Sequence, residues 1–178
     1  MNQKYLFHYK RFGMLRYLSH LETMKMIDRL LRRTGIELKQ TEGFHQRIKI
    51  SFAQAVPTGI IDLAGLFVVT TFEAINDEYI KTANELSPNG FEIVKIEKKC
   101  EKFKLSKFVE GYEFKLLFLE KPLDLPFDVE KKNGIWIARI FRSFNSSVPK
   151  NGEYGQFLTI RSKVVTREVQ VDKSTCGG

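Results

Sequence analysis

The order and spacing of apolar residues predict an α+β fold, and three observations support this prediction. Short aromatic and β-branched runs alternate with two segments of helical periodicity over residues 1–100. These elements follow one another as strand, helix, strand, strand, helix, strand. Beyond Cys100 the helical period disappears, and further apolar runs are separated by polar loops. We therefore expect a ferredoxin-like βαββαβ sandwich at 1–100 and a mostly β C-terminal region at 101–178.

The first strand and helix are defined by their boundary residues. The run at 5–12 is rich in aromatic residues with partial alternation, and we expect a strand that turns at Gly13. Ser19 and Glu22 have the spacing of a capping box, in which the side chain of each residue bonds the backbone N–H of the other. Gly35 supplies the left-handed residue that ends many helices.

This helix has two opposite faces at 100° per residue. One face is expected to pack into the core and carries His20, Met24, Ile27, Leu30 and Leu31. The opposite face is basic and carries Lys25, Arg29, Arg32 and Arg33. Such a face is either a solvated surface or a surface that binds an anionic partner.

The rest of the first hundred residues completes the predicted order. Residues 42–53 begin as a loop and end as a strand, and the β-branched run at 66–74 is typical of a central strand. A second helix is expected within 75–90, with Asn76 as its N-cap. The clean alternation at 91–99 predicts a strand.

The second half is expected to consist mainly of strands. Three runs at 111–120, 134–144 and 155–169 have strand character. Between them we expect loops at 121–134 and 145–155, because these stretches are rich in turn-forming residues. The sequence leaves open whether these strands extend the first sheet or form a small lobe of their own.

Composition places the chain among globular proteins and excludes several kinds of site. Hydrophobic residues make up 43% and charged residues 28% of the 178 residues. Since no apolar run approaches the roughly 20 residues that cross a bilayer, we expect no membrane insertion and a cytoplasmic location. The two cysteines, Cys100 and Cys176, are too few for a metal or iron–sulfur site in this chain, and no cofactor is expected.

The positive charge is concentrated in the first quarter of the chain. The net charge is +8, and residues 1–50 hold 11 Lys/Arg against 4 Asp/Glu, a net of +7. Residues 51–100 hold 4 against 7, a net of −3. A localised excess of this kind favours phosphate binding, although it also serves solubility.

A family resemblance rests on four segments. They are LRYLSHLE at 15–22, RRTG at 32–35, GFHQRIKISFA at 43–53 and PTG at 57–59. Over residues 12–60 the chain resembles the bacterial radical SAM-linked family, also called DUF2344. Members of that family are known mainly as neighbours or fusions of radical S-adenosylmethionine (SAM) proteins, often near genes for RNA processing. The resemblance therefore implies a radical SAM protein as partner.

Any radical SAM chemistry would belong to that partner and not to this chain. The C-x-x-x-C-x-x-C motif that holds the iron–sulfur cluster of such enzymes is absent from the sequence. A glycine-rich phosphate loop of the G-x-x-x-x-G-K kind is absent as well, which argues against a nucleotide triphosphatase.

Two histidines are the candidate catalytic residues. His20 lies on the core-facing side of the first helix, where it is either a packed core residue or an acid/base group with a pKa near neutrality. His45 lies in a polar loop with Arg47 and Lys49, where it either contacts a phosphate or base or has no ligand. Arg16 and Tyr17 precede the helix and are expected to meet phosphate beside its free amides.

These features predict a non-catalytic module that binds RNA or presents a substrate beside a radical SAM enzyme. The expected RNA is a tRNA or ribosomal RNA undergoing modification or processing. The expected nucleic-acid-binding residues are Arg16, Tyr17, Lys25, Arg29, Arg32, Arg33, His45, Arg47 and Lys49. One alternative is a metal-independent RNA-processing enzyme that uses His20, His45, Arg47 and Lys49. A second alternative is a protein-interaction domain whose basic face docks an acidic partner.

Overall fold

The computed structural model describes residues 2–42, 46–76, 78–123, 125–150 and 153–167. It combines a mostly stranded sheet with few helices, so the α+β prediction is confirmed at this level. The first half contains β1 Gln3–Arg11, the 3-10 helix η1 Gly13–Tyr17, α1 His20–Arg33, β2 Ile50–Phe52, β3 Ile61–Thr71, α2 Tyr79–Glu85 and β4 Phe91–Lys99. The second half contains α3 Leu105–Phe108, β5 Val109–Phe118, β6 Val129–Lys132, β7 Ile135–Ser143 and β8 Leu158–Thr166.

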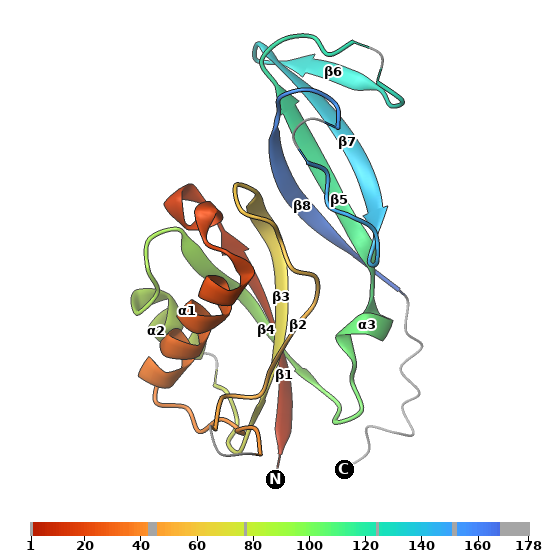
Figure 1. Ribbon diagram of the computed structural model, residues 1–178. Helices are drawn as coiled ribbons and strands as arrows, with labels where there is room; N and C mark the ends of the chain where they lie inside the picture. The colour runs from red at the N-terminus through yellow and green to blue at the C-terminus, as the bar shows by residue number, and fades with distance from the viewer. Residues whose placement is uncertain (1, 43–45, 77, 124, 151–152, 168–178) are drawn as a thin grey trace.

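The eight strands of the described residues belong to one sheet, with the order β4-β1-β3-β8-β5-β7-β6 and with β2 paired to β3. Figure 1 shows two groups of strands, one against α1 and α2 and the other formed by β5 to β8. The pairing between the groups is short and parallel, and it joins Ile61 to Ile160 and Asp62 to Arg161. The sheet is therefore continuous but narrow at this junction.

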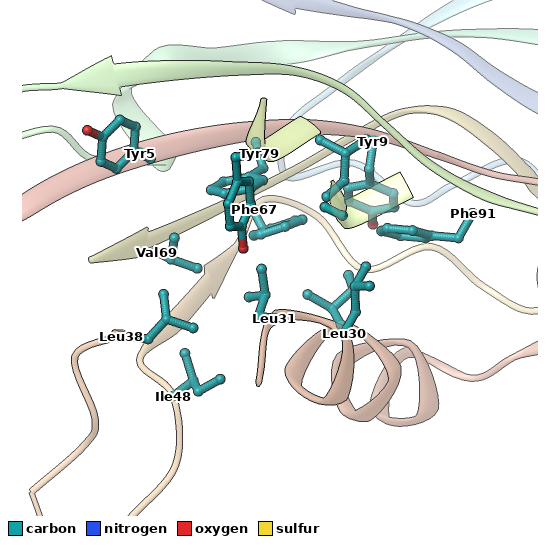
Figure 2. Packing of buried hydrophobic residues seen from close by; sticks show 14 residues of the cluster. Tyr5, Tyr9, Leu30, Leu31, Leu38, Ile48, Phe67, Val69, Tyr79 and Phe91 are labelled. Atoms are coloured by element: carbon teal, nitrogen blue, oxygen red, sulfur yellow. The ribbon is translucent and has the colours of Figure 1, made fainter. Parts of the chain in front are cut away.

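The main core lies between the sheet and the two longer helices. Alternate residues of β1, namely Tyr5, Phe7 and Tyr9, face α1, whose Leu30 and Leu31 are buried against them. Figure 2 shows this packing, with the leucines directed toward the aromatic rings of the sheet. The burial of three apolar α1 positions agrees with the predicted core face: Ile27, Leu30 and Leu31.

A second core covers the opposite face of β1 and β3. Leu6, Leu66 and Val68 pack there against Tyr112 and Phe114 of β5. Both faces of the first group of strands are thus buried in part. Residues of the second half of the chain cover the face of the sheet that does not pack against α1 and α2.

The second helix begins later than the sequence indicates. Asn76 was expected as its N-cap, but α2 starts at Tyr79 and Glu78 occupies the N-cap position without a side-chain bond. The backbone N–H of Ile75 donates to the hydroxyl of Tyr5 at 3.1 Å, which holds the preceding segment against the sheet. The carbonyl of Asn76 accepts the N–H of Tyr79 at 3.2 Å in a turn before the helix, so the N-cap prediction is wrong.

The loop predicted at 121–134 contains a strand. β6 pairs with β7 through a two-residue turn formed by Asn133 and Gly134, whose φ angles are 49° and 81°. Asn-Gly is the preferred dipeptide for this hairpin turn because both positions need positive φ. The Asn133-Gly134 pair therefore indicated a hairpin, but the many turn-forming residues of 121–134 led to the prediction of a loop.

Candidate nucleic-acid interface

The N-terminus of α1 has the predicted capping box. The backbone N–H of Ser19 donates to Glu22 Oε2 at 2.7 Å, and the backbone N–H of Glu22 donates to Ser19 Oγ at 3.2 Å. These bonds with Ser19 lower the pKa of the Glu22 carboxyl. The carboxylate of Glu22 therefore already occupies the N-terminus of α1, where the sequence predicts that a phosphate binds beside free amides.

Arg16 and Tyr17 pair with each other in η1, just before the capping box. Arg16 Nη2 donates to Tyr17 Oη at 2.6 Å, and the guanidinium carbon lies 4.6 Å from the centre of the tyrosine ring. The carbonyl of Arg16 also accepts the N–H of Gly59 at 2.8 Å. The PTG turn is thereby fixed to the segment that precedes α1.

Two hollows on the surface of α1 share the side chains of Lys25 and Arg29. The larger, about 760 Å³, lies between α1 and the end of α2, and Arg33 also lines it. The smaller, about 290 Å³, brings in Arg47 from the segment before β2. We call Lys25, Arg29, Arg33 and Arg47 the α1 basic surface. All four are exposed, and among the described residues none of them forms an ion pair.

Arg32 differs from its neighbours on the same helix. Its Nε donates to Asp28 Oδ2 at 2.9 Å, in an (i, i+4) ion pair. The hydrogen bond with Asp28 raises the pKa of the Arg32 guanidinium. Arg32 also lines a separate hollow with Gly35 and Gln40, so it is not part of the α1 basic surface.

Arg47 is positioned by backbone bonds to the adjacent segment. Its carbonyl accepts the N–H of Thr41 at 2.7 Å, and its own N–H donates to Thr41 Oγ1 at 3.2 Å. Lys49, only two residues later, lines another hollow on a different face of the sheet. The basic residues predicted from this segment are therefore divided between two places.

His20 links two of the segments that carry the family resemblance. Its ring is half-buried and meets the ring of Phe52 edge-on, with centroids 5.4 Å apart. Burial lowers the pKa of this imidazole, and the nearby charges of Arg11 and Arg161 lower it further. No side-chain hydrogen bond joins the ring to another residue within the described ranges. His45, the second candidate, lies outside the described residues.

Beneath His20 lies a buried charged cluster that the sequence analysis missed. Arg11 is 2% exposed, and its Nη1 donates to the carbonyl of Leu18 at 2.9 Å and to Thr23 Oγ1 at 2.6 Å. Arg161 is 1% exposed and forms a bidentate ion pair with Asp62, with Nε to Oδ1 at 2.7 Å and Nη2 to Oδ2 at 2.5 Å. Its guanidinium carbon also lies 4.3 Å from the centre of the Tyr112 ring.

The buried position of Arg11 is predictable from the sequence. Arg11 is in phase with the inward-facing residues Tyr5, Phe7 and Tyr9, so alternation alone places it on the buried face. The partnership of Asp62 with Arg161 joins residues 99 positions apart, and only the pairing of β3 with β8 brings them together.

Among the described residues, no group of three or more His, Cys, Asp and Glu is arranged to hold a metal ion. No helix within the described ranges is long and apolar enough to cross a membrane.

Comparison with protein families identifies the family of this chain. A family model described as "Uncharacterized protein conserved in bacteria (DUF2344)" matches residues 4–174. No curated protein matches the chain. The family match extends well beyond the 12–60 segment on which the sequence resemblance rested.

Proposed function

The chain belongs to the DUF2344 family, and we propose that it is a non-catalytic cytoplasmic module that binds RNA beside a radical SAM enzyme. The observation that carries this proposal is the α1 basic surface. Lys25 and Arg29 from the helix and Arg47 from the segment before β2 line one hollow. Convergence of cations from two segments favours a shaped anionic ligand over a merely solvated helix face.

The chemistry of this surface suits a phosphate backbone. The only acidic residue that lines the smaller hollow in the described structure is Asp28, whose carboxylate is engaged by Arg32. Exposed cations without protein partners displace the counterions that are condensed on a phosphate backbone, which supplies a large share of the affinity in nucleic-acid binding. Arg33 extends the same surface toward Pro88, which follows α2. An extended ligand such as RNA needs a surface that continues in this way.

The arrangement of His20 supports binding rather than catalysis. A general acid or base needs a partner group within hydrogen-bond reach of the reacting atoms. The described neighbours of the His20 ring are Phe52 and the positive charges of Arg11 and Arg161, and these supply neither a nucleophile nor a second acid/base group. Arg47 and Lys49 line different hollows, so the enzyme alternative has no shared site among the described residues.

We also propose that the first half of the chain forms a ferredoxin-like unit. In the first half the strand order is β4-β1-β3, with β2 on the side of β3 away from β1, and all these pairings are antiparallel. This order supports a ferredoxin-like unit, an architecture that hosts many unrelated functions. The proposed radical SAM partner rests on the sequence resemblance, and its substrate would be the bound tRNA or ribosomal RNA.

Fluorescence anisotropy with a labelled tRNA tests the RNA proposal. We expect the double variant Arg29→Ala/Arg47→Ala to bind about tenfold more weakly, because two phosphate contacts are lost. Lys132→Ala removes an exposed charge from β6 and should leave the affinity unchanged. Equal affinity of the double variant and the parent would contradict the proposal.

Incubation of the purified protein with total cellular RNA separates binding from cleavage. We expect intact RNA in the absence of partner proteins. Discrete products that disappear in His20→Ala would establish the enzyme alternative instead. If RNA is neither bound nor cleaved while an acidic protein partner is captured through Arg29, the protein-interaction alternative is correct.

A further inference from the structure

The hollow that Lys49 lines has a volume of about 490 Å³ and lies on the face of the sheet that α1 and α2 leave free. On β1, Tyr5 and Phe7 face the helices, so Lys4 and Leu6 face the opposite side. Its lining residues come mainly from this face of the sheet and from the segment that leads into α3. We call its basic residues, Lys4, Lys39, Lys49 and Lys104, the lysine cluster.

Backbone pairing places three of these lysines in a row across the sheet. Lys4 on β1 is opposite Thr70 on β3. The carbonyl of Thr70 accepts the N–H of Lys39 at 2.8 Å, and the carbonyl of Lys39 accepts the N–H of Lys49 at 2.9 Å. Like charges at neighbouring positions on one face of a sheet are unfavourable unless an anion lies between them.

The remaining groups of the hollow do not neutralise this charge. Glu101 is its one acidic residue in the described structure, and it offers its backbone carbonyl to Lys4 Nζ. Lys4 Nζ also donates to the carbonyl of Phe103 at 3.2 Å, so Lys4 holds the wall of the hollow in place. Within the described ranges, Lys39 and Lys104 form no ion pair, and Lys49 forms none either.

Hydroxyl groups and aromatic rings complete the lining. Ser51, Thr70 and Ser106 add donors suited to phosphate oxygens, which accept bonds from hydroxyls and ammonium groups alike. Phe103 and Phe144 supply an apolar wall against which a flat ring can pack. The volume lies within the range of small-molecule sites, roughly 300 to 1,000 Å³.

We propose that this hollow binds a nucleotide with two or three linked phosphates. The phosphates contact Lys39, Lys49 and Lys104, and the base lies against Phe103 and Phe144. The site is separate from the α1 basic surface and does not depend on RNA binding there. No hydrolysis is part of the proposal, because the hollow contains a single carboxylate and no phosphate loop.

Isothermal titration calorimetry of the full chain with ATP tests the site. ATP is expected to bind more tightly than pyrophosphate, because the base adds contacts with the aromatic wall, and adenosine without phosphate is expected to bind more weakly than either. Lys39→Ala and Lys104→Ala should each weaken ATP binding about tenfold, since each removes a charge-assisted hydrogen bond. Lys102→Ala is the matched control, because Lys102 is exposed close to the hollow but does not line it.

Three results would overturn the proposal. The first is no heat of binding with ATP at millimolar concentration. The second is equal weakening by Lys102→Ala and Lys39→Ala, which would indicate diffuse attraction to a basic protein. The third is pyrophosphate binding as tight as that of ATP, which would show that the base adds no contact and that the ligand is not a nucleotide. Arg29→Ala should leave ATP affinity unchanged, so this test and the RNA test fail independently. Circular dichroism of each variant verifies that it is folded.

Discussion

Arg29 and Arg161 carry the same charge in two regions of opposite character. Arg29 is exposed on α1, and it lines two hollows without an ion pair to any described residue. Arg161 is 1% exposed at the junction of β3 and β8, where Asp62 holds it through two hydrogen bonds. Burial of an unpaired charge is costly, whereas an exposed charge needs no partner. The difference teaches that the buried arginines hold the fold together and the exposed ones remain available for a ligand.

The largest expected effect comes from breaking the buried pair. Asp62→Asn leaves Arg161 buried opposite a neutral group, and we expect a loss of about 3 to 5 kcal/mol in the free energy of unfolding. Urea denaturation measures this change. Glu113→Gln removes the partner of Lys163 in an exposed pair and should leave stability close to that of the parent. Similar losses of stability in the two variants would contradict the distinction between buried and exposed charges.

A smaller effect is expected at the start of α1. Ser19→Ala removes the bond to the N–H of Glu22 and should cost about 1 kcal/mol of stability. The thermal midpoint and the urea midpoint should both fall. Ser147→Ala, at an exposed position in a loop of the second half, serves as the control. An unchanged midpoint for Ser19→Ala would mean that the capping box contributes nothing to stability.

The pair between Asp28 and Arg32 offers a way to enlarge the α1 basic surface. Asp28→Asn releases Arg32 and removes one negative charge from the smaller hollow. We expect RNA affinity to rise about twofold, since an exposed (i, i+4) pair holds its members weakly. Reduced affinity in anisotropy measurements would show that Asp28 orders the surface instead of competing with the ligand.

The smallest expected effect concerns the pH dependence contributed by His20. Burial, with Arg11 and Arg161, lowers the pKa of this imidazole in the folded state below 6.5. As the pH falls below this value the unfolded chain takes up the proton first, so His20 reduces stability on the acid side. His20→Gln should therefore lose less stability than the parent between about pH 7 and pH 5. Parallel pH profiles would show that the imidazole titrates normally.

Local signals made parts of this molecule predictable from sequence. The Ser19 capping box and the buried face of α1 depend on residues within a few turns of one helix, and both agree with the structure. The strand at 91–99 was also placed correctly, because its first residues alternate, although the pairing with β1 is irregular at Val94. Such features need no knowledge of the rest of the fold.

Long-range contacts account for what the sequence did not reveal. The segment before α2 is bonded to β1 through Ile75 and Tyr5, and the charged junction depends on the register of β3 against β8. The division of Arg47 from Lys49 likewise depends on how this segment folds against α1 and β3. The composition of the first fifty residues indicated a basic surface, but it did not show that Arg29 and Arg47 line a hollow on α1 whereas Lys49 lines a hollow on a different face of the sheet.

The salt dependence of RNA binding tests the central claim most directly. The parent and the triple variant Lys25→Ala/Arg29→Ala/Arg47→Ala are titrated with tRNA at several salt concentrations. Each phosphate contact contributes roughly 0.7 to 0.9 to the slope of log K against log salt. If the α1 basic surface binds RNA, the slope of the triple variant is shallower by about two units, and Lys132→Ala retains the parental slope. An identical slope in the triple variant and the parent would contradict the proposed role of this surface.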